Sequence, residues 1–198
     1  MNIKFYDFLK AVMPPLYNII LPSKVTGLEN IPKEGGMIMC SNHIHWTDCL
    51  FLAARMPVRR YTYLAKAEVF SNKLFKLILG EKGLGAIPIN RGAADLAAIR
   101  AALKVVADGH ALGIFPQGTR SRDNTPTPML NGVSMIAMRA NVPIIPVYID
   151  GPYRLFRRTD VRIGKPIDIS DLGRKFDADT LSEVTKRIET AIWSMKNV

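Results

Sequence analysis

The chain has 198 residues, of which 48% are hydrophobic and 22% are charged. These values are ordinary for a globular protein and allow one sizeable hydrophobic core. Lysine and arginine total 27 against 17 acidic residues, so the net charge is +10 at pH 7. Such an excess favours an anionic partner: nucleic acid, an acidic membrane or a phosphorylated substrate. With only 2 cysteines, the composition excludes a disulfide-rich scaffold and favours a reducing compartment.

The N-terminal segment, residues 1–22, is apolar but is interrupted by Asp7, Lys10 and the pair Pro14-Pro15. A transmembrane helix needs about 20 mainly apolar residues, and this segment also lacks the small residues that end a secretory signal. It predicts an amphipathic helix, kinked or stopped at the prolines. Such a helix can pack on the protein's own core, or it can anchor the protein at an anionic bilayer surface. The apolar residues at helical spacing are Phe5, Phe8, Leu9, Val12 and Leu16.

Apolar and amphipathic runs alternate along the rest of the chain. In chain order, their periodicity predicts a strand at 36–40, a helix at 46–56, a strand at 60–64, a helix at 68–79, a strand at 85–89, a helix at 93–107, a strand at 111–115, a helix at 131–140, strands at 143–149 and near 161–163, and a helix at about 179–195. This alternation predicts a single α/β domain over residues 23–198, with a mostly parallel or mixed sheet flanked by helices.

His43 and Asp48 lie in the run SNHIHWTD (41–48), directly after the first predicted strand. On one continuous helix they would point in different directions. They converge if His43 lies in the turn before the helix and Asp48 in its first turns. A histidine beside a carboxylate can act as a general base, and the acceptor's own hydroxyl can then be the nucleophile. Taken alone, the pair fits a structural histidine capped by aspartate equally well.

Two further polar runs, AIPINRG (86–92) and FPQGTRSR (115–122), also follow predicted strands. Arg91 can grip a phosphate or carboxylate through two hydrogen bonds. Gly118 lets backbone N–H groups approach a ligand closely, and Arg120 and Arg122 add positive charge. Each run alone can also be a solvated surface turn. Because ligands bind outside the carboxyl ends of strands in open α/β sheets, the shared position of the three runs indicates a site.

In this order, the runs resemble the signature of the glycerophospholipid acyltransferase family, whose best-known members are the lysophosphatidate (1-acylglycerol-3-phosphate) acyltransferases. The family's blocks are NHxxxxD, a block that ends in arginine, FPEGTR, and a proline-flanked apolar strand. This chain has NHIHWTD (42–48), INRG (89–92), FPQGTR (115–120) and VPIIPV (142–147). The ordered set spans residues 42–147 and is far more specific than any block alone.

The resemblance implies an enzyme that transfers an acyl group from acyl-CoA or acyl carrier protein to the free hydroxyl of a lysophospholipid. His43 would be the general base, Asp48 its orienting carboxylate, and Arg91 the ligand of the acceptor phosphate. It implies no metal or other cofactor, and no nucleic-acid partner. The expected location is the cytoplasmic face of the cell membrane, bound peripherally or monotopically to anionic lipid. The short stretch before the histidine block leaves room for a short interfacial anchor but not for longer membrane segments.

The resemblance also implies that Gly118 and its neighbours Gln117, Thr119 and Arg120 shape the acceptor and oxyanion region. Lys66, just after a predicted strand, is a further candidate for binding phosphate. Gln117 departs from the family pattern because it stands where the common pattern has glutamate. A role that needs negative charge is therefore lost at this position, and a hydrogen-bonding role is favoured.

Two other classes of function compete with this interpretation. The pair His43-x-His45 resembles the start of a metallohydrolase site, but such a site usually needs three or more protein ligands. The remaining histidine, His110, lies at a predicted helix end, where the helix dipole favours it. A basic nucleic-acid- or membrane-binding module without catalysis is suggested by the net charge and by four arginines, but no recognition motif accompanies them. These are Arg154, Arg157, Arg158 and Arg162.

Overall fold

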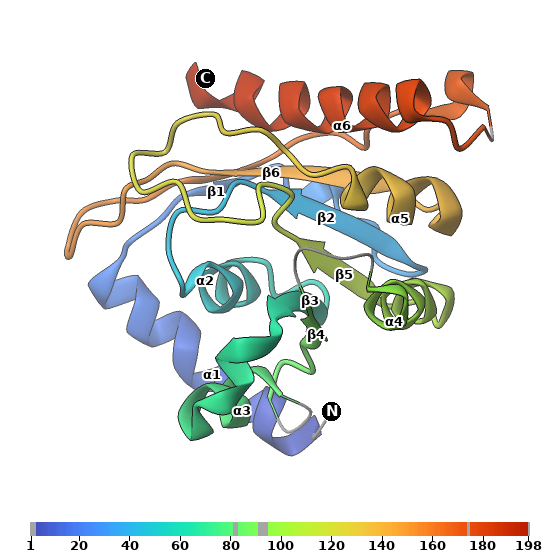
Figure 1. Ribbon diagram of the computed structural model, residues 1–198. Helices are drawn as coiled ribbons and strands as arrows, with labels where there is room; N and C mark the ends of the chain where they lie inside the picture. Colours follow the sequence, from blue (N-terminus) through green and yellow to red (C-terminus); the bar gives the residue numbers. More distant parts are fainter. Residues whose placement is uncertain (1–2, 81–82, 91–94, 174, 198) are drawn as a thin grey trace.

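Seven strands form one sheet between two layers of helices in the computed structural model, which describes residues 3–80, 83–90, 95–173 and 175–197 (Figure 1). The strands are β1 (Val25–Thr26), β2 (Met37–Ser41), β3 (Tyr61–Lys66), β4 (Ile87–Ile89), β5 (Ala111–Ile114), β6 (Ile144–Ile149) and β7 (Val161–Ile163). The α-helices are α1 (Ile3–Ile20), α2 (Asp48–Arg55), α3 (Lys73–Leu79), α4 (Leu96–Ala107), α5 (Gly132–Ala140) and α6 (Ala178–Trp193). Short 3-10 helices lie at Leu28–Asn30, Ala67–Ser71, Ser170–Leu172 and Ser194–Asn197.

The sheet order is β1-β7-β6-β2-β5-β3-β4. The five strands from β6 to β4 are parallel to one another, whereas β7 is antiparallel to β6 and pairs in parallel with β1. The predicted fold class, an α/β domain with a mostly parallel or mixed sheet, is confirmed. The parallel strands β6, β2 and β5 are neighbours, so their carboxyl ends lie side by side at one edge of the sheet.

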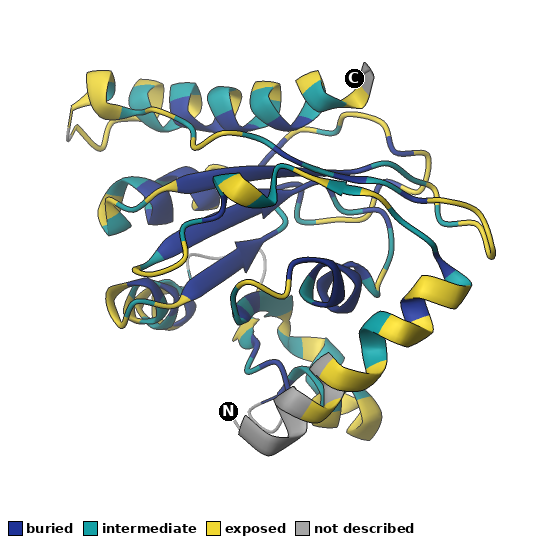
Figure 2. Cartoon of the chain, turned by 180° about the vertical axis from the view of Figure 1, so that it is seen from behind, coloured by how far each residue is buried: buried dark blue, intermediate teal, exposed yellow. Residues whose placement is uncertain are grey.

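The sheet is buried because helices cover both of its faces (Figure 2). Alternate residues of β2 enter two separate cores: Met37 and Met39 pack with α1 and α2, whereas Ile38 and Cys40 pack with α4, α5 and α6. This two-sided burial explains why the central strands read as continuous apolar runs rather than as alternating patterns. All residues of β2, β5 and β6 are buried.

Helix α1 does not stop at Pro14 and Pro15, which both lie inside it. An interior proline removes a backbone hydrogen bond and usually breaks a helix. Here the residues beyond the prolines are held by the core: Tyr17 and Leu21 are buried. The Arg55 guanidinium of α2 also donates to the Leu21 carbonyl at 2.9 Å. One face of the N-terminal helix therefore belongs to the core.

The opposite face of α1 carries apolar side chains that remain exposed. We call this set the α1 stripe; it consists of Phe8, Val12, Leu16 and Ile19, which are 57, 42, 45 and 69% exposed. The side chains of Phe5 and Leu9 lie outside the described residues. Within the described residues, no helix combines the length and apolar character needed to cross a bilayer.

The helix predicted at 68–79 is divided into two elements. A 3-10 helix covers Ala67–Ser71, and α3 begins only at Lys73. The side chain of Asn72 accepts hydrogen bonds from the N–H groups of Leu74 and Phe75, so it caps α3 and fixes the boundary. The strand β1 was not predicted, because two residues are too short for a periodic signal.

The close approach of Gly113 in β5 to Tyr63 in β3 gives a stability prediction. A Cβ atom at Gly113 would meet the Tyr63 ring at 2.4 and 2.5 Å. The Gly113→Ala variant should therefore lose about 1–3 kcal/mol of unfolding free energy through overpacking. Urea denaturation measures this loss. Gly132→Ala is the matched control, since nothing lies within 4 Å of the added carbon. Equal stability of the two variants would contradict the packing argument.

Candidate active site

The polar runs that follow β2 and β5 meet at the carboxyl ends of these strands. The strands pair in parallel, with Met37 opposite Ala111 and Cys40 opposite Ile114, so both runs leave the same edge of the sheet. The His43 N–H donates to Gln117 Oε1 at 2.8 Å. The His43 carbonyl accepts from the Ser121 N–H, also at 2.8 Å. The first and third polar runs thus form one site around His43.

Asp48 is the first residue of α2 and is fully buried. Its Oδ2 lies 2.7 Å from His43 Nδ1. The same oxygen accepts hydrogen bonds from the N–H groups of Ile44 at 2.7 Å and His45 at 2.9 Å. The turn between β2 and α2 therefore wraps around this carboxylate, which is why two residues five apart converge. The positive end of the α2 dipole also favours a negative charge here.

The ring of His43 is held in one orientation. Because its Nδ1 faces the Asp48 carboxylate, this nitrogen carries the proton and Nε2 keeps a free lone pair in the neutral ring. The ring stacks on Phe115, with centroids 4.3 Å apart and planes 21° apart. Nε2 has no hydrogen-bond partner among the described residues, and 18% of the side chain is exposed. The arrangement presents a base toward solvent at the end of the sheet.

Tyr153, from the loop after β6, also binds Asp48. Its hydroxyl donates to Asp48 Oδ1 at 2.7 Å, and its ring lies 5.1 Å from that of Phe51 and 5.4 Å from that of His45. Burial, followed by the nearby Asp48 carboxylate, raises the pKa of Tyr153 well above its usual value, so the hydroxyl remains a donor. Tyr153 was not predicted as a site residue, because it lies outside every block and 105 positions from Asp48.

Asn42, the first residue of the histidine block, is buried and ties β2 to β6. Its Nδ2 donates to the Ile149 carbonyl at 2.9 Å and to Asn124 Oδ1 at 2.8 Å, and its Oδ1 accepts from the Ile149 N–H at 2.8 Å. Asn124 adopts a φ of 50° and was also missed. Asparagine adopts this left-handed conformation more readily than most residues. The residue type at position 124 is therefore the one feature of the sequence that could have indicated Asn124. These contacts make Asn42 a structural brace beside the base.

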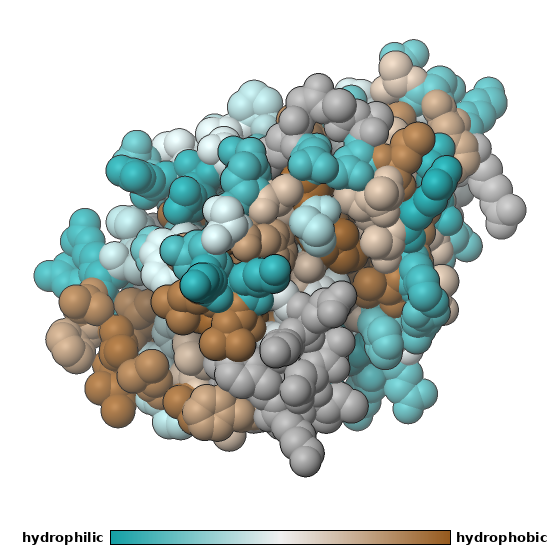
Figure 3. All heavy atoms as spheres, turned by 60° about the horizontal axis from the view of Figure 1, so that its bottom comes forward, coloured by the Kyte–Doolittle hydropathy of each residue, from teal (hydrophilic) through white to brown (hydrophobic). Residues whose placement is uncertain are grey.

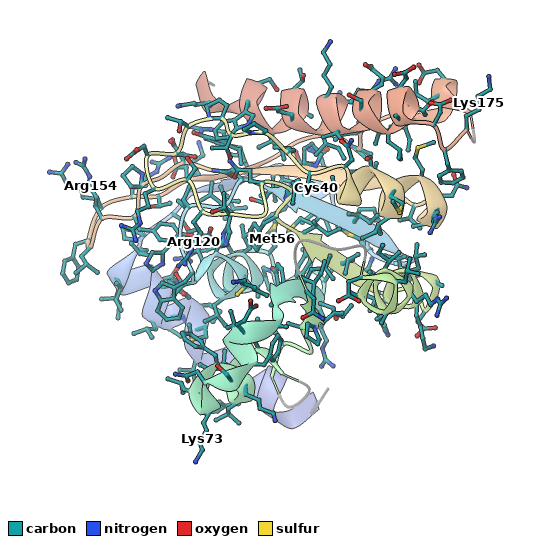
Figure 4. All side chains as sticks on the ribbon, viewed as in Figure 1. Cys40, Met56, Lys73, Arg120, Arg154 and Lys175 are labelled. Atoms are coloured by element: carbon teal, nitrogen blue, oxygen red, sulfur yellow. The ribbon has the colours of Figure 1, made fainter. Side chains whose placement is uncertain are left out.

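A cavity of about 320 Å³ opens next to His43 rather than over it. Its walls come from three loops and include Ile44, His45, Trp46, Arg120, Arg122, Pro152 and Tyr153. Figure 4 shows Arg120 at the same end of the sheet as the loop that carries Arg154. The walls therefore combine apolar and aromatic surface with two arginines, which suits an amphipathic and anionic ligand.

The third run places its residues differently. Gly118 has a φ of 65°, a left-handed backbone conformation that favours glycine. Thr119 and Arg120 are exposed. Gln117 is 4% exposed, and its Nε2 donates to Thr127 Oγ1 at 2.6 Å. Three neighbours thus have three functions: Gln117 holds the His43 backbone, Gly118 makes the turn, and Arg120 faces the cavity.

Of the two candidate phosphate ligands, Lys66 and Arg91, only Lys66 is among the described residues. Lys66 ends β3, and its Nζ lies 3.0 Å from Glu68 Oε1, with both side chains well exposed. Lys66 is paired in register with Ile89, the last residue of β4, so it lies at the edge where the second run begins. Arg91 itself lies outside the described residues. The position predicted for the acceptor phosphate therefore remains a prediction.

The metal-site interpretation requires ligands that the fold separates. His110 precedes β5 whereas His43 follows β2, so these histidines lie at opposite ends of two parallel strands. Across the described part of the chain, no group of three or more His, Cys, Asp or Glu side chains could hold a metal ion.

The two cysteine thiols are unsuited to act as nucleophiles. Burial raises the pKa of Cys49 to about 12 and also raises that of Cys40.

The comparison with protein families identifies the chain as an acyltransferase. A protein-family model described as Acyltransferase matches residues 22–150, and the chain belongs to this family. The chain is 28% identical over 197 residues to the 1-acyl-sn-glycerol-3-phosphate acyltransferase of Bacillus subtilis, and the alignment covers 97% of both chains. It is 29% identical over 194 residues to the enzyme of the same name from Streptococcus pneumoniae, covering 94% of this chain and 71% of that one.

A solved structure supports the same conclusion about the fold. The crystal structure of the 1-acyl-sn-glycerophosphate (LPA) acyltransferase PlsC from Thermotoga maritima superimposes with a TM-score of 0.70. The superposition covers 98% of this chain and 79% of that chain, at 23% sequence identity. At this identity, the likeness shows that the two proteins share a fold. The family resemblance seen in the sequence blocks is confirmed by the family match.

The hydroxyl of Tyr153 gives a testable prediction about the site. Tyr153→Phe removes the described donor to Asp48 Oδ1. Loss of a hydrogen bond to a buried carboxylate should lower the unfolding free energy by about 1–3 kcal/mol, measured by urea denaturation. In an Asp48→Asn background, the same substitution should cost clearly less, since the charged acceptor is gone. Equal costs in both backgrounds would show that the hydroxyl does not stabilise Asp48.

Proposed function

We propose that this protein acylates the free hydroxyl of a lysophospholipid such as 1-acylglycerol-3-phosphate, with an acyl thioester as donor and His43 as the general base. The observation that carries the proposal is the contact of 2.7 Å between His43 Nδ1 and Asp48, which leaves Nε2 of the histidine without a hydrogen-bond partner among the described residues. The cavity is lined from the next residue, Ile44, onward. The names of the relatives from Bacillus subtilis and Streptococcus pneumoniae support the acceptor class.

The chemistry needs one base and no covalent intermediate on the protein. Nε2 of His43 takes the proton from the acceptor hydroxyl while its oxygen attacks the thioester carbonyl carbon. The tetrahedral intermediate then collapses, the carbon–sulfur bond breaks, and the imidazolium returns the proton to the departing thiolate. Asp48 stabilises the imidazolium while it exists, because its carboxylate lies against Nδ1. The products are the diacyl lipid and the free thiol.

Positive groups around the cavity fit the charges of both substrates. Arg120 and Arg122 line the cavity, and Lys66 and Arg91 are the further candidates for the acceptor phosphate. The backbone around Gly118 is the candidate for stabilising the oxyanion, because it borders His43 through Gln117. The donor can be acyl-CoA or acyl carrier protein, since both are acidic. No metal or other cofactor enters this chemistry.

The lipid acceptor requires that the site reach a bilayer, and the α1 stripe is the proposed contact. An amphipathic helix with one apolar face exposed can lie in the interface plane. The inner face of α1 is fixed to the core through Tyr17 and Leu21, so the stripe is presented rigidly rather than on a tether. We place the protein at the cytoplasmic face of the membrane, bound peripherally or monotopically.

His43→Ala tests the general base directly. The variant should stay folded and lose acyl transfer by about 10²–10⁴-fold, the usual contribution of a general base. Asp48→Asn should also lower the rate severely. His110→Ala is the matched control, because it removes an exposed imidazole that precedes β5 and therefore lies at the opposite end of the parallel strands from His43. Turnover above a tenth of the wild-type rate in His43→Ala, measured with radiolabelled donor, would refute the assignment.

Arg91→Ala tests the acceptor phosphate. The loss of a charge-assisted hydrogen bond should cost about 1.5–3 kcal/mol, roughly ten- to a hundred-fold in the apparent affinity for the acceptor. The KM for the thioester should change far less. Arg100→Ala, at an exposed arginine of α4, is the control for a general loss of charge. Equal effects of Arg91→Ala on both substrates would remove Arg91 from this role.

A further inference from the structure

The loop that joins β6 to β7 runs from the cavity to an exposed, basic and apolar tip. Pro152 and Tyr153 line the cavity. The next five residues, Arg154-Leu155-Phe156-Arg157-Arg158, are all exposed. We call them the 154–158 loop. Because β6 is parallel to β2, this loop leaves the sheet at the edge where the site lies.

Two large apolar side chains at the tip have no protein surface to cover them. Leu155 is 69% exposed and Phe156 is 73% exposed. Phe156 also has a φ of 61°, a left-handed conformation that bulky residues rarely adopt. A strained backbone that presents an aromatic ring to solvent is a feature that suggests function rather than packing.

The tip is held against the end of α1 by two backbone hydrogen bonds. The Phe156 N–H donates to the Ile20 carbonyl at 2.8 Å, and the Thr159 N–H donates to the Pro22 carbonyl at 2.8 Å. Thr159 is only 1% exposed, so the base of the loop is anchored. Ile20 follows the last residue of the α1 stripe. The loop tip and the α1 stripe therefore meet at one place on the surface.

Positive charge surrounds the two apolar side chains. Arg158 is paired with Asp160 at 2.5 and 2.7 Å, which compensates its charge. Arg154 and Arg157 have no carboxylate partner among the described residues. On the face that carries α1 and α3, apolar side chains gather at the lower left, directly below hydrophilic ones (Figure 3). Apolar groups bordered by unpaired arginines complement an anionic bilayer, which offers acyl chains below a layer of phosphates.

We infer that the 154–158 loop is a second membrane-binding element, in which Leu155 and Phe156 insert beneath the headgroups and Arg154 and Arg157 bind anionic lipid phosphates. Together with the α1 stripe, the loop fixes the orientation of the protein on the bilayer. A single helix on a surface can still rotate about its axis, whereas a helix with a second, adjoining contact beside it cannot. Since Tyr153 links the loop to Asp48, this orientation brings the cavity mouth to the lipid. The inference rests on the proposed function for the nature of the acceptor.

The experiment measures sedimentation of the full-length protein with vesicles of phosphatidylcholine alone or with 30% phosphatidylglycerol. Leu155→Ser/Phe156→Ser should weaken binding to both by about tenfold or more. Arg154→Gln/Arg157→Gln should weaken binding only to the anionic vesicles and lower its salt dependence. Two matched controls should bind like the wild type. Leu96→Ser/Phe176→Ser removes an exposed leucine of α4 and an exposed phenylalanine of the loop before α6, and Arg100→Gln/Arg139→Gln removes the same charge.

Activity separates this inference from the proposed function. Both loop variants should acylate a water-soluble short-chain acceptor at the wild-type rate, and lose activity only on long-chain acceptor presented in vesicles. If the wild type transfers no acyl group but the loop variants lose vesicle binding, the proposed function fails and the membrane contact stands. Wild-type vesicle binding by both loop variants would overturn the inference. So would a loss of binding to duplex DNA in Arg154→Gln/Arg157→Gln with vesicle binding intact.

Discussion

The carboxylate of Asp48 is the contact through which the segments of the site are held together. Its Oδ2 contacts His43 Nδ1 and accepts hydrogen bonds from the N–H groups of Ile44 and His45. Its Oδ1 accepts a hydrogen bond from the hydroxyl of Tyr153. All four partners can donate a hydrogen bond, so the position demands a group that only accepts, which an ionised carboxylate is. An amide in the same place would turn its own N–H bonds toward at least one of these donors. The geometry of the base thus depends on a buried charge.

The sheet makes this cluster possible because it brings distant segments to one edge. Asn42 and Asp48 follow β2, Gln117 follows β5, and Tyr153 follows β6. These three strands are neighbours and parallel, so their following loops are close, although Asp48 and Tyr153 lie 105 positions apart in the sequence. Asn42 then ties β2 to β6 through two hydrogen bonds with Ile149, and a third joins it to Asn124 in the loop after β5. The rigidity of His43 is therefore a property of three loops rather than of its own turn.

Much of the arrangement could be predicted from the sequence, and the failures have common physical causes. Strand and helix periodicity located the central elements, and the ordered blocks placed His43, Asp48 and Gln117 in one site. Tyr153 was missed because a hydrogen bond across the sheet leaves no local pattern. Of the two outcomes expected for α1 at Pro14-Pro15, a kink or a stop, the stop does not occur, because burial of residues beyond the prolines outweighs the local loss of hydrogen bonds. In both cases tertiary contacts decided what local rules could not.

The glutamine at position 117 shows how the site accommodates its departure from the family pattern. Gln117 Oε1 accepts from the His43 N–H, and its Nε2 donates to Thr127 Oγ1. A glutamate could accept the first bond equally well, and the threonine hydroxyl could reverse its role and donate the second. The two residues thus satisfy the same partners, while only glutamate would add a buried charge near His43. A buried charge with two neutral partners carries a large desolvation cost. The requirement at this position is therefore an acceptor for the His43 backbone, which the neutral amide meets without that cost.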